Sequence, residues 1–473
     1  MEEHDFDVAV IGAGPAGEKA AIKAAYFGKR VALIERAERF GGACGKGGLA
    51  SKILRESALQ YRGAMRRLVD VLQPVPRQEL AMENLLRAVD LVCDAHFRGV
   101  RDGIEAHHID WIRGEARFAG PHRLPVDGER ALDAETIVVA TGSRPSRPSF
   151  VPWGAPNVYD ADTILGMPRV PRRLAVVGGG VIGTELASIF AALDVEVDLV
   201  EQRSRILPFL DDDVGDHLLV ELRARGAHTH LGAEVTACET GPDGVRLTVA
   251  GGAPIDADAV LFAGGRLANT DGLGLEDIGV ELGRQGRPVV DEVFRTRVPH
   301  VYAVGDVIGF PALASTAMEQ GRVAIGHALR AELAGRPDAI PADSLPYPLV
   351  PYGIYTIPSV SMVGATEAQL RAAGTPYLVG TSSYARHSRA HLIGDTSGRL
   401  KLLCDPVTRR VLGVHIVGET AEELIHLGQA CMHFDGTIEY FLRSVFNFPT
   451  LAGLYKSAAY DILAKLGASR APA

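Results

Sequence analysis

The chain has 473 residues, and at about 150 residues per domain this length allows roughly three domains, each with its own core. A short peptide and a small disulfide-stapled scaffold are therefore excluded. Hydrophobic residues make up 47% of the chain, charged residues make up 23%, and the formal net charge is −9. This composition is ordinary for a globular protein, and its mild acidic excess argues against a nucleic-acid partner.

Five cysteines lie far apart, without CxxC spacing and in an odd total, so neither a disulfide framework nor a structural zinc site is indicated. The first residues, MEEHDFD, are acidic where a signal peptide would be basic. No stretch approaches the ~20 apolar residues that cross a bilayer. We therefore expect a cytoplasmic protein with no metal site and no membrane partner.

The first predicted unit is a strand, a glycine-rich turn, a helix and a second strand. Residues 6–11 (FDVAVI) form a short apolar run that ends at the turn 12–17 (GAGPAG). The small-residue stretch EKAAIKAAYF and the apolar run RVALIE follow, an order that is typical of this supersecondary unit. Residues 53–107 are expected to be largely helical, and residues 109–142 to return to short strands.

A second copy of the same unit begins near the middle of the chain. Residues 173–178 (RLAVVG) lead into the turn 178–183 (GGGVIG), which is followed by the helical stretch ELASIFAAL and the apolar run VEVDLVE. Glu35 lies 23 residues after the first glycine of the first turn, and Glu201 lies 23 residues after the first glycine of the second. These equal offsets indicate an internal duplication.

The last third of the chain contains two more glycine-ended strands and a separate domain. The runs AVLFAGG and HVYAVGD lie within residues 257–306, and the second ends in Asp306, which is placed to reach a polyol hydroxyl. Taken alone, such an acid would more often be a helix cap or a turn residue. A segment with five prolines then leads into a mixed α+β domain of roughly 120 residues.

The two turns have the features of dinucleotide-binding sites. A strand before each GxGxxG motif, a helix after it and an acid at the end of the next strand make the motif specific. The glycines allow a tight turn, a close approach of the backbone to a pyrophosphate, and close helix packing, while the helix N-terminus attracts phosphate. The predicted class is therefore α/β, with two Rossmann-like dinucleotide-binding domains and a C-terminal α+β domain. A glycine-rich turn without a ligand is the alternative for each copy.

Over nearly all of its length, the chain resembles the flavoproteins related to dihydrolipoamide dehydrogenase and glutathione reductase. The matching pieces are VAVIGAGPAG, GGAC, VVATGSRP, VVGGGVIGTELA, FAGGRLANT, VYAVGDV and FNFPTLAG. The resemblance implies that the first copy binds FAD, that the second binds NAD(H) or NADP(H), and that the C-terminal domain forms a homodimer. The predicted domains are 1–150 and 276–345 for FAD, 151–275 for NAD(P), and 346–473 for dimerisation.

The resemblance also assigns ligand-binding positions. The positions that match the FAD site are Gly12, Gly14, Gly17, Glu35, Arg36, Gly42, Lys52, Thr141, Gly142, Asp306 and Ala314. The positions that match the nicotinamide nucleotide site are Gly178, Gly180, Ile182, Gly183, Glu201, Arg203 and Gly265.

Two departures from the family concern thiol chemistry. Members that reduce disulfides carry a second cysteine soon after the first, because a dithiol relay needs two sulfurs within bonding reach. Here Cys44 is followed by residues 45–50 without a second cysteine, in a loop one residue shorter than usual. Those members also use a histidine oriented by a glutamate, and these positions are Phe448 and Gly453 here. Cys44 is a catalytic candidate by position, although the missing relay favours a small packed residue near the flavin.

One branch of the family, the soluble pyridine nucleotide transhydrogenases, lacks the second cysteine and keeps an aromatic residue at the histidine position. The chain is most similar to that branch in ASIFAALDVEVDLVEQRSRILPFLDDD and FNFPTLAGLYKSAAYDILAKL. The similarity implies an oxidoreductase that transfers hydride from NADPH to NAD⁺ through FAD in a ping-pong cycle. The alternatives are an NAD(P)H:quinone reductase or diaphorase, dihydrolipoamide dehydrogenase itself, and a non-enzymatic flavin-binding subunit.

Lys52 and Glu185 are the residues predicted to lie against the isoalloxazine ring. The family places this lysine near flavin N5 and pairs it with a glutamate two residues after the third glycine of the second motif. A surface lysine and a helix-surface glutamate are the alternative. Glu201 favours the free ribose hydroxyls of NAD(H), whereas Arg203 and Arg205 either meet the 2′-phosphate of NADP(H) or are solvated.

Overall fold

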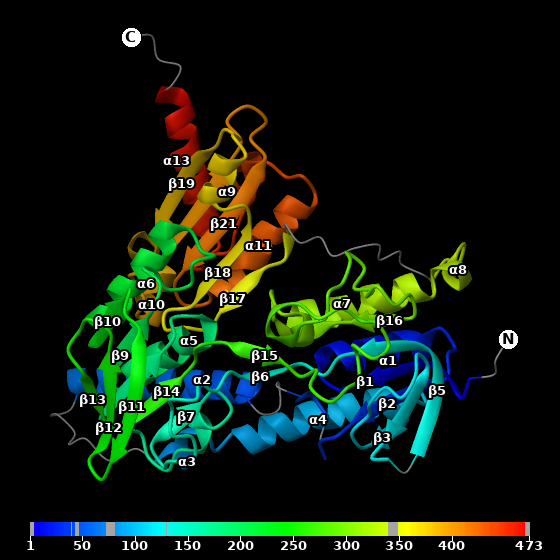
Figure 1. Cartoon of the computed structure of the whole chain (residues 1–473). Helices are drawn as coiled ribbons and strands as arrows, with labels where there is room; N and C mark the ends of the chain where they lie inside the picture. Colours follow the sequence, from blue (N-terminus) through cyan, green and yellow to red (C-terminus); the bar gives the residue numbers. More distant parts are fainter. Residues whose placement is uncertain are drawn as a thin grey trace. The chain divides into compact units, whose positions relative to one another are not determined.

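The computed structural model describes residues 4–38, 40–42, 47–71, 81–128, 130–338 and 349–468 (Figure 1). The backbone clusters into two units, each built from segments that are distant in the sequence. The first unit comprises Met1–Ile53, Leu86–Ser146 and Gly265–Leu345, and the second comprises Leu54–Leu85, Arg147–Gly264 and Pro346–Ala473.

A parallel sheet forms the centre of the first unit. Its strand order is β16-β5-β1-β2-β3, and β4 adds to β5 in the antiparallel direction. The strands are β1 (Phe6–Ile11), β2 (Val31–Glu35), β3 (Asp110–Arg113), β4 (Arg123–Val126), β5 (Arg130–Val139) and β16 (Val301–Ala303). A separate antiparallel pair joins β6 (Ser143–Pro145) to β15 (Arg266–Ala268).

Apolar residues cover both faces of this sheet, as expected for parallel strands. Val8 and Leu33 face one core, while Ala9 and Ile34 face another, because successive side chains of a strand alternate. The described helices that belong mainly to this unit are α1 (Pro15–Tyr26), α4 (Val89–Ala106), α7 (Ala314–Ala328) and α8 (Arg330–Leu333), with the 3-10 turns η3 (Arg284–Gly286) and η4 (Gly305–Ile308). The helices α1 and α7 pack closely, since a Cβ on Gly321 would lie 2.3 Å from the carbonyl oxygen of Ala16.

The second unit begins with another parallel sheet, of order β10-β9-β8-β14-β7. Its strands are β7 (Val158–Asp160), β8 (Arg173–Val177), β9 (Glu196–Glu201), β10 (Ala227–Leu231) and β14 (Ala259–Phe262). An antiparallel meander follows β10 and consists of β11 (Val235–Gly241), β12 (Gly244–Val249) and β13 (Ile255–Ala257). The helices are α3 (Met82–Leu85), α5 (Val181–Ala192) and α6 (Asp212–Ala224), with the 3-10 turn η2 (Ile164–Gly166). Helix α2 (Leu49–Val71) starts in the first unit and continues in the second.

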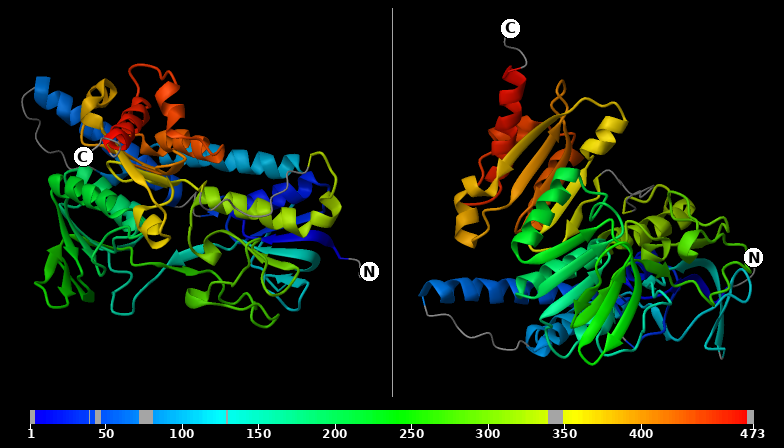
Figure 2. Two further views of the ribbon diagram at one scale, coloured as in Figure 1. Left: turned by 90° about the horizontal axis from the view of Figure 1, so that it is seen from above. Right: turned by 60° about the vertical axis from the view of Figure 1, so that its left-hand side comes forward.

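The C-terminal part of the second unit is an antiparallel sheet with helices against it (Figure 2, yellow to red). The strand order is β17-β18-β21-β20-β19. The strands are β17 (Tyr352–Ile354), β18 (Val360–Gly364), β19 (Leu378–Ser383), β20 (Arg399–Cys404) and β21 (Val411–Val417). The helices are α9 (Glu367–Ala372), α10 (Ser388–Ile393), α11 (Ala421–His433), α12 (Ile438–Arg443) and α13 (Gly453–Ala468), with the 3-10 turn η6 (Tyr384–Arg386). Helices α11 and α13 share one apolar core with β20 and β21.

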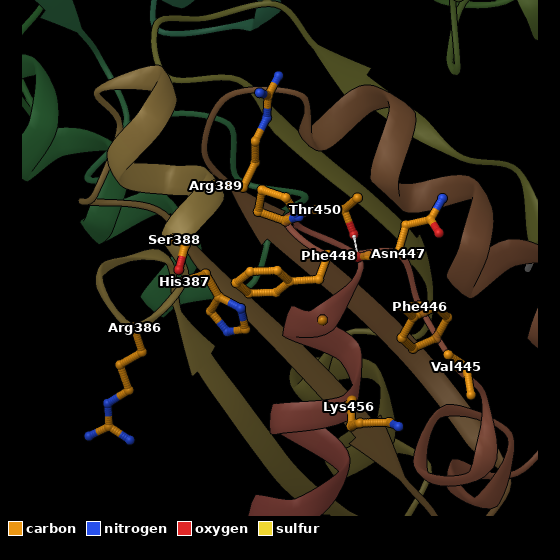
Figure 3. A pocket seen from close by; sticks show the side chains of 12 residues that line it. Arg386, His387, Ser388, Arg389, Val445, Phe446, Asn447, Phe448, Thr450 and Lys456 are labelled. Carbon is orange, nitrogen blue, oxygen red and sulfur yellow. Dashed lines mark hydrogen bonds between the residues drawn. The ribbon is translucent and has the colours of Figure 1, made fainter.

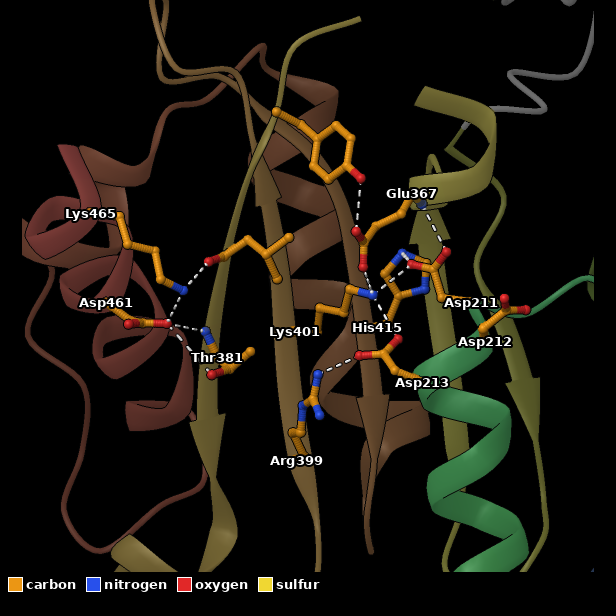
Figure 4. A network of polar contacts seen from close by, with 12 residues as sticks. Asp211, Asp212, Asp213, Glu367, Thr381, Arg399, Lys401, His415, Asp461 and Lys465 are labelled. Atoms are coloured by element: carbon orange, nitrogen blue, oxygen red, sulfur yellow. Dashed lines mark hydrogen bonds and ion pairs between the residues drawn. The ribbon is translucent and has the colours of Figure 1, made fainter. Parts of the chain in front are cut away.

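A buried lysine holds the start of α6 against this C-terminal sheet (Figure 4). The side chain of Lys401 on β20 is only 2% exposed, and its Nζ lies 3.0 Å from Asp211 Oδ2 and 2.7 Å from Asp213 Oδ1. The same ammonium group contacts the carboxylate of Glu367 on α9. Three acids converge here as they would around a cation, and Lys401 supplies the positive charge. Burial by itself raises the pKa of Asp213 and Glu367, but the hydrogen bonds and charge of Lys401, together with Arg399 at Asp213 and Tyr377 at Glu367, lower both pKa values.

The predicted α/β class with two Rossmann-like sheets and a C-terminal α+β part is confirmed. Each of the two glycine-rich turns follows the predicted strand and opens the predicted helix. Among the described helices, none is both long and apolar enough to cross a membrane.

Candidate dinucleotide-binding sites

The three glycines of the first turn have three different surroundings. Gly12 has a φ of +103°, and a Cβ there would lie 2.4 Å from the carbonyl oxygen of Ala140 on the neighbouring chain segment. A Cβ on Gly17 would lie 1.9 Å from the oxygen of Gly12, so no larger residue fits where α1 meets β1. A Cβ on Gly14 would meet nothing within 4 Å. The open space at Gly14 lies at the N-terminus of α1, where a helix attracts phosphate.

The second turn repeats this geometry. Gly178 has a φ of +114°, and a Cβ there would lie 2.6 Å from the oxygen of Ala263. A Cβ on Gly183 would lie 1.9 Å from the oxygen of Gly178, whereas a Cβ on Gly180 would meet nothing within 4 Å. Corresponding glycines of the two turns therefore meet the same steric constraints, in agreement with the duplication seen in the sequence. Both turns fit a pyrophosphate approaching the middle glycine.

Glu35 is held against the first turn by two backbone amides. Its Oε2 accepts a hydrogen bond from the amide of Ala13 at 2.8 Å, and its Oε1 accepts one from the amide of Ala37 at 2.8 Å. The residue is 9% exposed. A carboxylate has about four lone-pair positions, so Glu35 can hold its own loop and still accept hydrogen bonds from ribose hydroxyls.

Glu201 makes the same two bonds in the second copy. Its Oε2 accepts from the amide of Gly179 at 2.5 Å, and its Oε1 accepts from the amide of Arg203 at 2.8 Å. The side chain of Arg203 is exposed. Arg205 is engaged differently, because its Nη1 donates to Asp216 at 2.8 Å and its Nε lies 3.4 Å from Asp212.

The remaining FAD candidates of the first unit lie near the carboxyl ends of its strands. Gly42 lies close to the first turn, since a Cβ on Gly42 would lie 3.2 Å from the Cα of Gly14. Thr141 follows β5 and donates to the carbonyl oxygen of Asn269 at 2.7 Å. Gly142 has a φ of +70° and open space around it, Ala314 begins α7, and the exposed Arg36 lies 3.3 Å from Glu115.

Asp306 lies in η4, directly after β16. Its Oδ2 accepts a hydrogen bond from Ser143 at 3.3 Å. Burial raises the pKa of Asp306, although the charge of Arg266 and the Ser143 bond act in the opposite direction. The sequence analysis predicts that Asp306 contacts a polyol. The hydroxyl groups of such a polyol would donate hydrogen bonds to the Asp306 carboxylate and so favour its ionised form.

Glu185 and Lys52, the candidates for the flavin ring, lie on different helices. Glu185 is 5% exposed on α5, and its Oε1 accepts a hydrogen bond from the backbone amide of Tyr355 at 2.8 Å. Lys52 lies in the first turn of α2 and is half-buried. Ile182 lies in the first turn of α5, and Gly265 falls in the first unit, just before β15. Cys44 lies outside the described residues.

The four described cysteines cannot supply the missing second thiol. Cys93, Cys238, Cys404 and Cys431 are buried and take part in no disulfide. Burial raises the pKa of Cys238 and of Cys431 to about 11 and that of Cys404 to about 12. Because the thiolate is the reactive form, these three thiols are inert at neutral pH.

Residues of the segment 446–453 (FNFPTLAG) line a cavity of about 280 Å³ (Figure 3). Phe448 is 85% exposed, and it lines the cavity together with His387. A Cβ on Gly453 would lie 3.5 Å from His387 Nδ1, while Nε2 of this histidine is 3.1 Å from Ser382 Oγ. Burial lowers the pKa of His387. Sequence analysis could not single out His387, because only tertiary packing brings it close to Gly453 and Phe448.

Comparisons with known proteins agree with this architecture. A family model described as pyridine nucleotide-disulphide oxidoreductase matches residues 6–321, and the model of its dimerisation domain matches residues 350–459. Two nucleotide-binding turns and this C-terminal domain define a class of nicotinamide-dependent oxidoreductases. The chain belongs to the pyridine nucleotide-disulphide oxidoreductase family.

Two curated relatives match along almost their whole length. The soluble pyridine nucleotide transhydrogenase of Mycobacterium bovis (strain BCG / Pasteur 1173P2) is 41% identical over 470 residues, which cover 98% of both chains. That of Shigella flexneri is 39% identical over 477 residues, covering 98% of this chain and 99% of the relative. Among solved structures, the HOCl-induced flavoprotein disulfide reductase RclA from Escherichia coli superposes with a TM-score of 0.84 at 28% identity, covering 96% of this chain and 99% of that one.

Proposed function

We propose that the chain is an FAD-dependent oxidoreductase that transfers hydride between NADPH and NAD⁺ by a ping-pong mechanism and without a redox-active disulfide. The observation that carries this proposal is the pair of matched turns, each with a middle glycine open toward a ligand and an acid held at the next strand. The relatives named soluble pyridine nucleotide transhydrogenase support it.

The two turns receive different ligands in this proposal. The first unit binds FAD through Gly14, Glu35 and Asp306, and the second binds the nicotinamide nucleotides through Gly180 and Glu201. FAD held by these residues would supply a hydride acceptor and donor between two nicotinamide nucleotides. Glu201 accepts hydrogen bonds from the ribose that carries adenine, and the exposed Arg203 meets the 2′-phosphate of NADP(H).

Lys52 and Glu185 complete the proposed site beside the flavin ring. A lysine charge near flavin N5 favours the reduced form electrostatically, and a glutamate partner would hold the ammonium group in place. The buried position of Glu185 and its hydrogen bond from Tyr355 support a defined role for this carboxylate.

The absence of a thiol relay separates this function from disulfide reduction. Phe448 and Gly453 stand where a histidine and its orienting glutamate are expected, and the described cysteines are buried. We propose that Cys44 packs near the flavin without a redox role, so that Cys44→Ser retains hydride transfer.

The proposal includes the assembly and the domain limits. The match to a dimerisation domain supports a homodimer formed through residues 346–473, with FAD-binding segments 1–150 and 276–345 and an NAD(P)-binding domain 151–275. A reducing, cytoplasmic environment suits a chain whose described cysteines take part in no disulfide.

The test is anaerobic hydride transfer from NADPH to thio-NAD⁺ by the FAD-loaded protein, with lipoamide and quinone reduction measured in the same preparation. Rapid transfer between nucleotides without lipoamide turnover is expected. Flavin that NADPH or NADH reduces but no nicotinamide nucleotide reoxidises would overturn the proposal and favour a quinone reductase or diaphorase. A purified protein that binds no FAD would instead favour a non-enzymatic subunit.

A further inference from the structure

The segment Tyr355–Ser359, which joins β17 to β18, holds one face of α5. The backbone amide of Tyr355 donates to Glu185 Oε1 at 2.8 Å, and the amide of Ile357 donates to Ser188 Oγ at 3.0 Å. Ser188 in turn donates to the carbonyl oxygen of Glu185 at 2.7 Å. Residues three apart on a helix lie on the same face, so the segment contacts α5 along one side.

The opposite side of the same segment is held by Arg55 of α2. Its Nε donates to the carbonyl oxygen of Thr356 at 3.0 Å, and its Nη2 donates to Ser359 Oγ at 2.6 Å. The same Nη2 lies 2.8 Å from Glu419 Oε2, and Nη1 lies 2.8 Å from the exposed Glu56. Only 2% of Arg55 is exposed.

A single peptide group therefore connects the two helices. The carbonyl of Thr356 and the amide of Ile357 belong to one peptide bond, which is planar and directs these two groups in opposite directions. Its oxygen accepts from Arg55 on α2, and its N–H donates to Ser188 on α5. A movement of Arg55 would tilt this peptide and shift the neighbouring amide of Tyr355, which orients Glu185.

The contacts of Arg55 need a guanidinium group. Its planar fork donates in several fixed directions at once, which a lysine ammonium on a flexible stem cannot reproduce. Thr356 and Ser359 are fully buried, so water would not replace the lost donors. Burial raises the pKa of Glu419 while the Arg55 charge lowers it, and removing the arginine would leave this carboxyl without its cation.

Arg55 also lies one turn beyond Lys52 on α2. We propose that Arg55 is a positioning residue for hydride transfer: it fixes the turn of α2 that carries Lys52 and, through the Thr356–Ile357 peptide, the carboxylate of Glu185. This inference rests on the proposed function, because only that proposal places Lys52 and Glu185 beside the flavin ring.

The test compares Arg55→Met with Arg55→Lys and with the control Glu56→Gln, which removes only the exposed partner. The rate constant of flavin reduction by NADPH, the flavin absorption spectrum and the flavin midpoint potential are measured without NAD⁺. We expect Arg55→Met to retain FAD, to reduce about tenfold to a hundredfold more slowly, and to have a lower midpoint potential and a shifted spectrum. Arg55→Lys should lie between Arg55→Met and the wild type, and Glu56→Gln should match the wild type.

A double-variant cycle separates positioning from general destabilisation. If Arg55 acts through Glu185, adding Arg55→Met to Glu185→Gln should slow flavin reduction little further. Fully additive losses, or a wild-type spectrum and reduction rate in Arg55→Met, would overturn the inference.

If Arg55→Met does not fold, a milder variant tests the same positioning role. Ser188→Ala removes the hydroxyl that accepts from the Ile357 amide and donates to the carbonyl oxygen of Glu185, and it leaves Arg55 in place. We expect a several-fold slower flavin reduction with KM for NADPH little changed. An unchanged rate would refute the proposed role. Because flavin reduction is followed without an acceptor, a wild type that reduces its flavin but fails to transfer hydride to NAD⁺ would contradict the proposed function alone.

Discussion

Glu201 accepts a hydrogen bond from the backbone amide of Arg203 at 2.8 Å, so the acid that would bind ribose also fixes the backbone of the neighbouring arginine. Arg203 is exposed at this point, and Glu201 is 7% exposed. In the proposed nucleotide site, a buried acid and an exposed arginine therefore stand two residues apart in the chain, at the position where NAD(H) and NADP(H) would be distinguished. This arrangement suits a site that admits both nucleotides.

Replacing Arg203 by glutamine is expected to weaken NADPH use selectively. A charge-assisted hydrogen bond contributes about 1.5–3 kcal/mol, so KM for NADPH should rise roughly tenfold to a hundredfold while KM for NADH stays close to wild type. Initial rates of flavin-dependent dye reduction with each nucleotide measure both values.

Arg205→Gln is the matched control for this substitution. Arg205 is held by Asp216 and Asp212, so its removal should raise KM for NADPH less than the loss of Arg203. Equal effects of Arg203→Gln on NADH and NADPH would show that Arg203 does not meet the 2′-phosphate.

Alanine at the middle glycine of each turn should remove one ligand and leave the fold intact. Gly14 and Gly180 have φ values of −73° and −76°, and a Cβ at either meets nothing within 4 Å. Gly14→Ala is expected to purify with little FAD, and Gly180→Ala to keep FAD but to show a raised KM for both nicotinamide nucleotides. Unfolding free energies should stay within about 1 kcal/mol of wild type.

Gly17→Ala provides the contrast, because its Cβ would lie 1.9 Å from the oxygen of Gly12. This variant should lose stability as well as flavin. Full FAD content in Gly14→Ala would mean that no pyrophosphate approaches the first turn.

The two turns could be predicted from the sequence because all their determinants are local. Gly12, Gly178, Glu35 and Glu201 lie within short strand–turn–helix–strand segments, and the spacing of the residues sets the geometry. The C-terminal α+β part was also predictable, from its proline-rich start and its mixed pattern.

The contacts of Arg55 and Lys401 could not be predicted in this way. Arg55 donates to Thr356, which is 301 residues further along the chain, and no periodic pattern relates residues at such a distance. Lys401 would be assigned to the surface from its residue type, yet its side chain is 2% exposed. Buried charges of this kind depend on partners that only the folded chain brings together.

Removing the buried lysine should cost much more stability than removing an exposed one. Lys401→Met leaves Asp211, Asp213 and Glu367 converging without their shared cation, and breaking such a buried pair costs about 3–5 kcal/mol. The control Lys465→Met removes an exposed pair with Asp461 on α13 and should cost less than about 1 kcal/mol. Urea denaturation of the dimer measures both values, and similar losses in the two variants would contradict the expected role of Lys401.

The same cluster should make the protein sensitive to acid. Lys401 lowers the pKa of Asp213 and Glu367 from ordinary values of 3.8 and 4.5. The folded chain therefore keeps these carboxylates ionised at pH values where the unfolded chain has begun to bind protons. Their contribution to stability is fully present above their ordinary pKa values and decreases as the pH falls through the lower folded values.

Lys401→Met should weaken this dependence, because burial without the lysine charge raises carboxyl pKa values, although Arg399 and Tyr377 still contact Asp213 and Glu367. The protonated acids then need no charged partner, so the stability difference between wild type and Lys401→Met should shrink as the pH falls from about 6 to about 3. Urea midpoints measured at several pH values provide the comparison, with Lys465→Met as the reference for exposed charge. A difference that stays constant or grows toward acid would show that Lys401 stabilises the fold by packing rather than by charge.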